Sequence, residues 1–150
     1  MTVFDIADLV PHSGTMSLLD RVVAYGDDWL EAEVIIKPES FFIDEEGVPA
    51  SVGLEYLAQA IAAYSGVQEQ VKGGKPKLGF LLGTRKYQCS TDYFKLGQIL
   101  RLKVVCEMQA ENGLHIFQCV LSGQDNVEAT ARLNVFQPDD ADKFLKDMTI

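Results

Sequence analysis

The sequence predicts an α+β fold in which one long helix is wrapped by an antiparallel sheet of five or six strands. Residues 50–70 form a single long stretch with helical character, whereas much of the remaining chain alternates between apolar and polar residues, as half-buried strands do. Turn signals such as Asn112-Gly113 separate successive strands. With 150 residues, of which 47% are hydrophobic, residues 1–150 are expected to form one domain around a sizeable core.

The predicted helix at residues 50–70 has recognisable start and stop signals. Pro49 lies just before it, Ser51 is a possible cap, and Gly73-Gly74 follow its end. Apolar side chains occupy nearly every side of this helix, which is typical of a helix buried in protein or in a membrane. Its polar residues and the strand-rich surroundings argue against a membrane, so we expect the sheet to bury it.

The alternating segments predict the strands, and turn residues bound several of them. Turns are expected at residues 26–28, 112–113 and 122–126. The predicted strands are residues 21–25, 29–37, 78–89, 99–108, 114–121 and 127–136.

The formal charge of the chain is −9, and it is unevenly spread. A nucleic-acid binder needs a basic face, so this function is not expected of an acidic chain. Residues 71–106 are the exception, with eight basic side chains and a single acidic one, Asp92. This segment either presents a positive patch to an anionic partner or supplies the solvent faces of strands.

The termini and the cysteines bear on location and cofactors. No basic region followed by an apolar stretch is visible at the N-terminus, so a secretory signal is not expected. The three cysteines stand singly inside apolar runs, without the paired spacing of a metal site. We therefore expect a cytoplasmic protein with reduced thiols and with no metal or other cofactor.

Glu55 is the candidate catalytic residue that the helix itself indicates. It is the only carboxylate between residues 49 and 68, and burial in an apolar helix would require it to be paired, hydrogen-bonded or protonated. A protonated carboxyl group near the helix start suits a general acid. Gln59 lies four residues further on and is expected on the same face, where it could hold the carboxyl group. The alternative is a glutamate that only meets the helix dipole and points to water.

The two histidines are the other candidates for acid–base chemistry. His12 lies in an irregular segment, where catalytic groups are often presented. His115 follows a hairpin turn within a predicted strand, and a structural role is expected for it. Neither has cysteine or carboxylate neighbours at metal-ligand spacing.

Several segments carry a resemblance to a known family. Residues 11–22 (PHSGTMSLLDRV), 53–59 (GLEYLAQ) and 94–97 (FKLG) resemble the 3-hydroxyacyl-acyl-carrier-protein dehydratases of the hotdog superfamily. Residues 48–60, 79–85 and 133–138 more closely resemble a divergent bacterial subgroup, often associated with polyketide-like or aryl polyene gene clusters. The resemblance spans about residues 9–138 and implies a hotdog fold, with dimers whose sheets join and whose active sites lie at the interface.

The chemistry that the resemblance implies is removal of water from a 3-hydroxyacyl thioester, giving the trans-2-enoyl thioester. In this interpretation His12 takes the α-proton, and Glu55 protonates the departing β-hydroxyl group. Backbone N–H groups around Ser51 and Gly53 would stabilise the enolate oxygen, and Gln59 would support the site.

One departure from the family pattern concerns the catalytic histidine. The fatty-acid dehydratases carry it in a Gly-His-Phe-Pro-Gly loop ahead of the central helix, whereas residues 40–49 (SFFIDEEGVP) are shorter and contain no histidine. Either His12 supplies the function from a different loop, or the chain lacks the dehydratase pair.

The resemblance also implies partners. An acyl carrier protein is acidic, so the basic segment is a plausible docking surface, with Lys72, Arg85 and Lys86 as contacts. A homodimer, or a heterodimer with a related hotdog subunit, is expected, and neither nucleic acid nor a membrane is. Two other interpretations stay open: a hotdog thioesterase in which the helix carboxylate acts alone, and a non-catalytic subunit of a related dehydratase.

Overall fold

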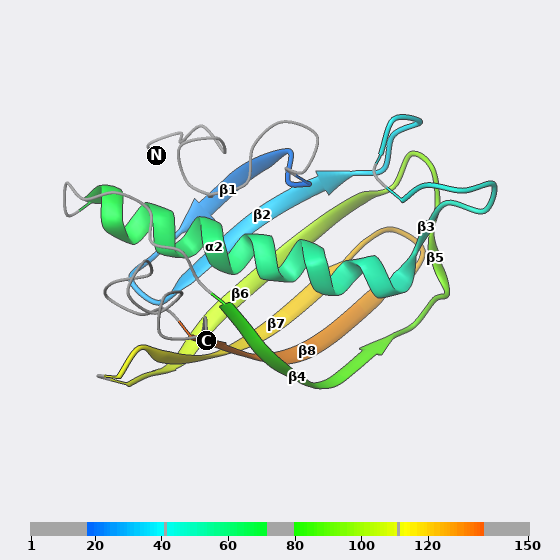
Figure 1. Cartoon of the computed structure of the whole chain (residues 1–150). Coiled ribbons are helices and arrows are strands. Elements are labelled where there is room, and N and C mark those ends of the chain that lie inside the picture. The colour runs from blue at the N-terminus through cyan, green and yellow to red at the C-terminus, as the bar shows by residue number, and fades with distance from the viewer. Residues whose placement is uncertain (1–17, 41, 72–79, 111, 137–150) are drawn as a thin grey trace, which may run out of the picture.

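The computed structural model of the chain describes residues 18–40, 42–71, 80–110 and 112–136. Its main elements are one long helix, α2 (Gly53–Val71), and a six-stranded sheet in the order β1-β2-β6-β7-β8-β4. All neighbouring strands in this sheet are antiparallel. The helix lies across the sheet (Figure 1). The predicted α+β class, with one helix and an antiparallel sheet, is confirmed.

The strands agree closely with the alternating segments. Each observed strand starts and ends within two residues of the predicted one, where both ends are described. A second sheet of two short strands, β3 (Val48–Pro49) and β5 (Tyr93–Phe94), was not predicted, because two residues are too few to show an alternation. The six main strands are β1 (Arg21–Tyr25), β2 (Trp29–Ile35), β4 (Phe80–Cys89), β6 (Ile99–Gln109), β7 (Leu114–Ser122) and β8 (Glu128–Phe136).

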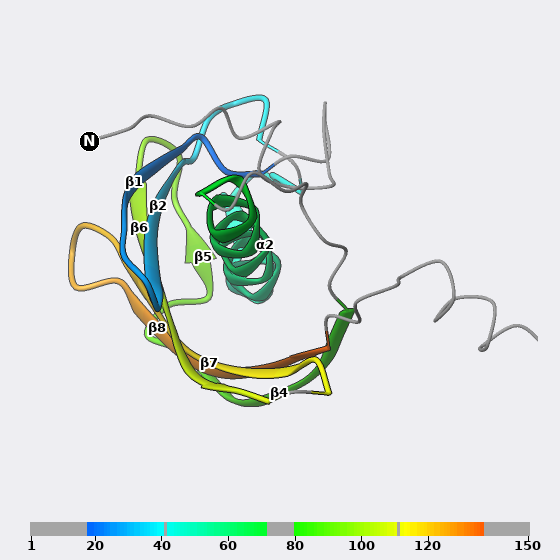
Figure 2. The same ribbon diagram turned by 90° about the vertical axis from the view of Figure 1, so that its left-hand side faces the viewer.

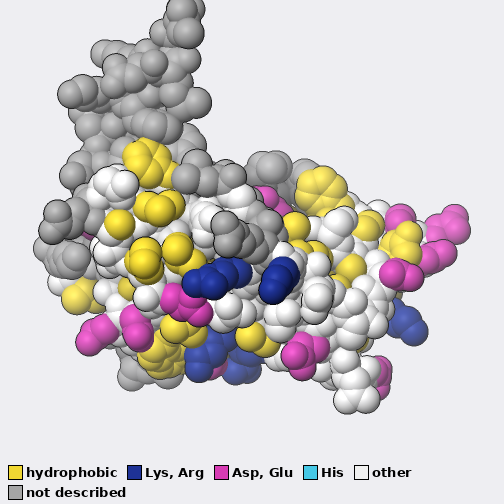
Figure 3. Space-filling view, turned by 90° about the horizontal axis from the view of Figure 1, so that it is seen from below, with side chains coloured by type: hydrophobic (Ala, Val, Ile, Leu, Met, Phe, Trp, Pro, Cys, Tyr) yellow, Lys and Arg dark blue, Asp and Glu magenta, His cyan; other side chains and the backbone are white. Residues whose placement is uncertain are grey.

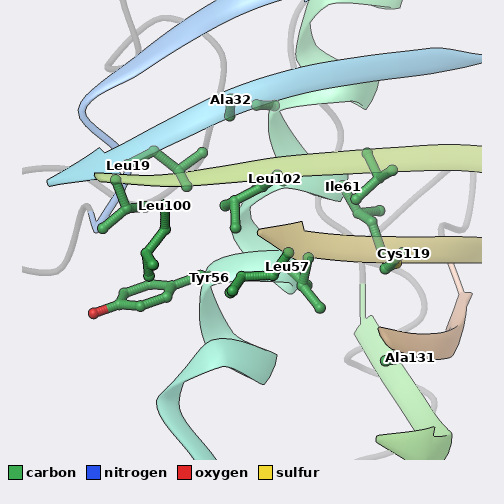
Figure 4. Packing of buried hydrophobic residues seen from close by; sticks show 14 of the residues in the cluster. Leu19, Ala32, Tyr56, Leu57, Ile61, Leu100, Leu102, Cys119 and Ala131 are labelled. Atoms are coloured by element: carbon green, nitrogen blue, oxygen red, sulfur yellow. The ribbon is translucent and has the colours of Figure 1, made fainter. Parts of the chain in front are cut away.

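The core lies between the inner face of the sheet and one side of α2. On β6, Leu100 and Leu102 are fully buried, and Leu57 of the helix is buried against the same cluster. Figure 4 shows Tyr56, Leu57 and Ile61 lying among the side chains of these strands. Because burying one large apolar side chain stabilises a fold by roughly 1.5–3 kcal/mol, this helix face anchors α2 to the sheet.

The prediction that α2 is buried all round is wrong. A 3-10 turn, Ala50–Val52, precedes the helix, and the sheet curves around only one side of both (Figure 2). Ser51 and Glu55 are exposed on the other side, and Ala58 and Ala62 are half-buried. The alanines on this side count as apolar in the sequence, although burying an alanine stabilises a fold far less than burying a leucine does.

A charged cluster stabilises the outer face of the sheet. Glu33 on β2 is buried, with its oxygens accepting hydrogen bonds from Arg21 at 3.0 Å and from Arg101 at 3.2 Å. The hydrogen bond from Arg21 is the largest cause of a lowered pKa for Glu33, and burial opposes it. The ionised form of Glu33 is therefore favoured in the folded state.

This cluster predicts a specific loss of stability in acid. The folded-state pKa of Glu33 lies below its unfolded value of about 4.3, so its contribution is present above that pH and fades as pH falls through the lower value. Unfolding free energies from urea titrations at pH 7 down to 3 should show a gap between wild type and Glu33→Gln that narrows below pH 4. A gap that stays constant across this range would contradict the assignment.

Candidate functional site

The start of α2 is held by the small two-stranded sheet. Pro49 of β3 pairs with Tyr93 of β5, and the Ala50 N–H donates to the Asp92 carbonyl oxygen at 2.8 Å. The chain then enters the 3-10 turn, where the Gly53 N–H donates to the Ala50 carbonyl oxygen. Glu55 follows two residues later, so its position depends on this turn.

Gly53 allows Tyr87 of β4 to approach the helix closely. A Cβ atom at Gly53 would lie 2.3 Å from the Tyr87 hydroxyl oxygen and 3.3 Å from the Phe94 ring. The Tyr87 hydroxyl donates a short hydrogen bond to the Ala50 carbonyl oxygen. Burial, with a smaller contribution from Cys89, raises the pKa of Tyr87, so the hydroxyl group remains a donor at neutral pH. Sequence analysis did not single out Tyr87.

Glu55 is exposed in the first turn of α2. The expectation that the helix buries this carboxyl group is wrong, because Glu55 lies on the side that the sheet leaves open. The arrangement instead presents a carboxyl group near a helix N-terminus, on the same outward side as Ser51. A molecule bound against this side could exchange a proton with Glu55.

Gln59 occupies a different environment from Glu55. Its side chain is 2% exposed, and its Oε1 atom accepts a hydrogen bond from the Leu18 N–H at 2.8 Å. Among the described residues, no hydrogen bond is seen between the side chains of Gln59 and Glu55, so the expected support of the carboxyl group is not observed. The amide of Gln59 instead ties the segment before β1 to the middle of α2.

The expected oxyanion donors are only partly available. The Gly53 N–H already bonds to Ala50 within the 3-10 turn, which contradicts its predicted role as a free donor. Ser51 is exposed at the same turn and remains a candidate. The structure thus brings Ser51, Gly53 and Glu55 together at one end of α2.

Several predicted site residues lie elsewhere or outside the described residues. His12 and Lys72 are outside the described ranges, as is the side chain of Arg85. Lys86 on β4 is exposed. His115 is buried on the inner face of β7, where its ring stacks on Phe117, in agreement with the structural role predicted for it.

Among the described basic residues of this segment, Arg101 and Lys103 lie on β6, which β7 and β8 separate from Lys86 on β4. Arg101 and Lys103 on β6 form ion pairs with Glu31 of β2, at 3.5 Å and 3.9 Å, and Arg101 also contacts Glu33. Arg101 and Lys103 therefore lie on the solvent face of the sheet, as the second interpretation of the basic segment predicts.

Lys86 instead borders a hollow on the outer face of β4, β7 and β8. The hollow has a volume of about 320 Å³. Figure 3 shows the side of the molecule on which these strands lie, where Lys and Arg side chains gather near Asp and Glu. It lies across the sheet from Glu55. Its lining residues are Lys86, Gln88, Gln118, Thr130, Ala131 and Arg132.

The described residues offer neither a cluster of metal ligands nor a membrane-spanning helix. In the part of the chain that the structure describes, no group of three or more His, Cys, Asp or Glu side chains could hold a metal ion. Within the same residues, no helix combines the length and apolar character needed to cross a membrane.

A long helix packed against a curved antiparallel sheet is the hotdog fold, and solved structures share it with this chain. Among solved structures, a hypothetical thioesterase with coenzyme A from Streptococcus pneumoniae TIGR4 shares 12% identity at a TM-score of 0.62, covering 78% of this chain and 84% of that chain. The PaaI protein of E. coli shares 9% identity at a TM-score of 0.60, covering 77% and 80%. These likenesses concern the hotdog fold alone.

The family match is more specific. Residues 4–146 match the ApeP-like family, described as ApeP dehydratase, and the chain belongs to this family. It is also similar to the dehydratase heterocomplex ApeI:P from Xenorhabdus doucetiae, with 26% identity and a TM-score of 0.89 over 98% of this chain and 99% of that chain. A search of curated proteins finds no match. The recognition of a hotdog dehydratase of the aryl polyene type is confirmed.

The contact between Gly53 and Tyr87 makes a testable prediction about the helix start. Alanine has the higher helix propensity by about 1 kcal/mol, yet Gly53→Ala should destabilise the protein, because its Cβ meets the Tyr87 hydroxyl oxygen. Adding Tyr87→Phe removes that oxygen and should recover much of the loss.

A double-mutant cycle measured by urea unfolding checks this. We expect the cost of Gly53→Ala to be about 1–3 kcal/mol in wild type and clearly smaller in the Tyr87→Phe background. Equal costs in both backgrounds would show that the hydroxyl group does not set the glycine requirement.

Proposed function

We propose that this chain takes part in the dehydration of a 3-hydroxyacyl thioester carried by an acyl carrier protein, as one subunit of a two-chain hotdog dehydratase. The observation that carries this proposal is the likeness to a dehydratase heterocomplex over nearly the whole chain, together with the family match. The divergent subgroup favours an aryl polyene or polyketide-like acyl chain.

The reaction requires a base, an acid and a site for developing negative charge. The base removes a proton from Cα, and an enolate forms as charge moves onto the thioester oxygen. The acid then protonates the β-hydroxyl group, which leaves as water while the Cα–Cβ double bond forms. Glu55 is our candidate acid and His12 our candidate base, with Ser51 near the enolate oxygen.

The exposed side of α2 and the free edge of the sheet both favour a second hotdog chain as the partner. The outward side of α2 around Glu55 lacks cover among the described residues, so water reaches the carboxyl group in the single chain. β4 is an edge strand of the sheet, and an edge strand offers unpaired N–H and C=O groups to another chain. We infer that the partner subunit joins near this edge and closes the site over Glu55.

The function is tested with the chain copurified with its hotdog partner and a 3-hydroxyacyl-carrier thioester, using mass spectrometry to detect loss of water and hydrolysis. We expect loss of water in the complex, and Glu55→Gln should reduce its rate by roughly 100-fold, as removal of a general acid does. His12→Ala tests the candidate base. Glu45→Gln, at an exposed loop position, is the matched control.

Other outcomes identify the rival functions. Hydrolysis that requires Glu55 but not His12 would identify a thioesterase, which releases a free thiol. Full water loss in the complex of the Glu55→Gln variant would show that the partner carries the chemistry, and this chain would then be a structural subunit. Either result would overturn the proposed role of Glu55.

The docking proposal concerns Lys86. Reversing its charge in Lys86→Glu should weaken binding of the acidic carrier protein by roughly five-fold at low salt, and the difference should shrink as salt is added. Fluorescence anisotropy with a labelled carrier protein measures this. An effect no larger than that of a distant charge reversal would remove Lys86 from the docking surface.

A further inference from the structure

Strand β4 contains a bulge next to the candidate site. Arg85 pairs with Arg132 of β8, and Gln88 pairs with Thr130, so two residues of β4 lie opposite the single residue Ala131. One of these two, Lys86, has a φ of 57°, a left-handed conformation that is uncommon for lysine. Such an extra residue reverses the alternation of side chains beyond it.

The bulge decides which way Tyr87 points. In a regular strand, residues 85 and 87 would share a face. Residue 85 pairs with Arg132, which is exposed on the outer face of the sheet, so residue 87 would also lie on the outer face. With the extra residue, Lys86 is exposed and Tyr87 instead reaches the start of α2. A strained residue that redirects a side chain beside a candidate site points to a role in that site.

Tyr87 contacts the turn from which Glu55 begins. Its hydroxyl donates to the Ala50 carbonyl oxygen, which also accepts the Gly53 N–H. The same hydroxyl oxygen lies against the Cα of Gly53, where no Cβ fits. One side chain therefore restrains both the turn and the first residue of α2, two residues before Glu55.

We propose that Tyr87, directed inward by the bulge at Lys86, is a positioning residue that fixes the start of α2 and with it the carboxyl group of Glu55. This inference rests on the proposed function for its catalytic consequence, but its structural part does not. Displacement of a catalytic group by a fraction of an ångström lowers a rate without abolishing binding.

The test compares two tyrosines with the same type of contact. Tyr64 also donates its hydroxyl to a backbone carbonyl oxygen, that of Asp27, at 2.7 Å, and burial raises its pKa to about 12. It lies in the second half of α2, away from the helix start. Tyr64→Phe is therefore a matched control for Tyr87→Phe, because each removes one hydroxyl group and one hydrogen bond.

Both variants are measured in the complex with the partner subunit. Tyr87→Phe should speed amide exchange at residues 50–54 by about five-fold and lower kcat by roughly ten-fold, with KM little changed. Tyr64→Phe should leave both quantities unchanged. The inference is overturned if Tyr87→Phe alters neither quantity, or if Tyr64→Phe lowers kcat as much.

A second pair of variants isolates the bulge from the charge of Lys86. Both Lys86→Asn and Lys86→Val remove the charge, but asparagine accepts the left-handed conformation and valine does not. On a thioester without a carrier protein, Lys86→Val should therefore lower kcat several-fold more than Lys86→Asn. Equal rates for the two would overturn the role of the bulge.

Failure of the proposed function remains distinguishable from failure of this inference. If the wild-type complex removes no water, the proposed function fails. Amide exchange at residues 50–54 then still decides whether Tyr87 fixes the helix start: faster exchange in Tyr87→Phe alone supports it, and unchanged exchange overturns it.

Discussion

The burial of one side of α2 against the curved sheet is the constraint on which the site depends. Tyr56, Leu57 and Ile61 are directed into the core, and this fixes the rotation of the helix about its own axis. Residues half a turn away must then face outward, which places Glu55 and Ser51 at the surface of the single chain. The same packing that stabilises the fold therefore presents the candidate carboxyl group.

The end of the helix is set by different interactions from its sides. The short β3–β5 sheet holds the backbone before α2, and Tyr87 holds the turn itself through the Ala50 carbonyl oxygen. The hydrogen bond from Tyr87 joins residues 37 positions apart in the chain, and the β3–β5 pairing also joins distant segments, so the helix start is a tertiary feature. The packing of α2 on the sheet sets the direction in which Glu55 points, and the contacts at the helix start fix where Glu55 lies.

Much of the fold was predictable because alternation is a local signal. Strands such as β7 and β8 follow from their own residues, and the turn at Gly113 adopts the positive φ of 94° that its glycine allows. The exposed side of α2 was not predictable by counting apolar residues, since Ala58 and Ala62 count as apolar but gain little from burial. Family resemblance located Glu55, but only the folded chain shows its environment.

The role of Tyr87 could not be predicted from the sequence. The inward direction of Tyr87 depends on a bulge centred on a left-handed lysine, and lysine, unlike glycine or asparagine, does not signal such a conformation. Gln59 gives a related lesson: its spacing from Glu55 suggested a shared role, yet the amide oxygen serves the Leu18 N–H. Long-range partners, which spacing along a helix does not reveal, decided both cases.

In the proposed complex, a second hotdog chain covers the outward side of α2. The most direct measurement is the alkylation rate of a cysteine placed one turn beyond Glu55, in Ala58→Cys, with the modified site mapped by mass spectrometry. Alkylation should be at least ten-fold slower in the complex with the partner subunit than in the folded chain without its partner. A cysteine that reacts equally fast in both would show that no second chain covers this side of α2.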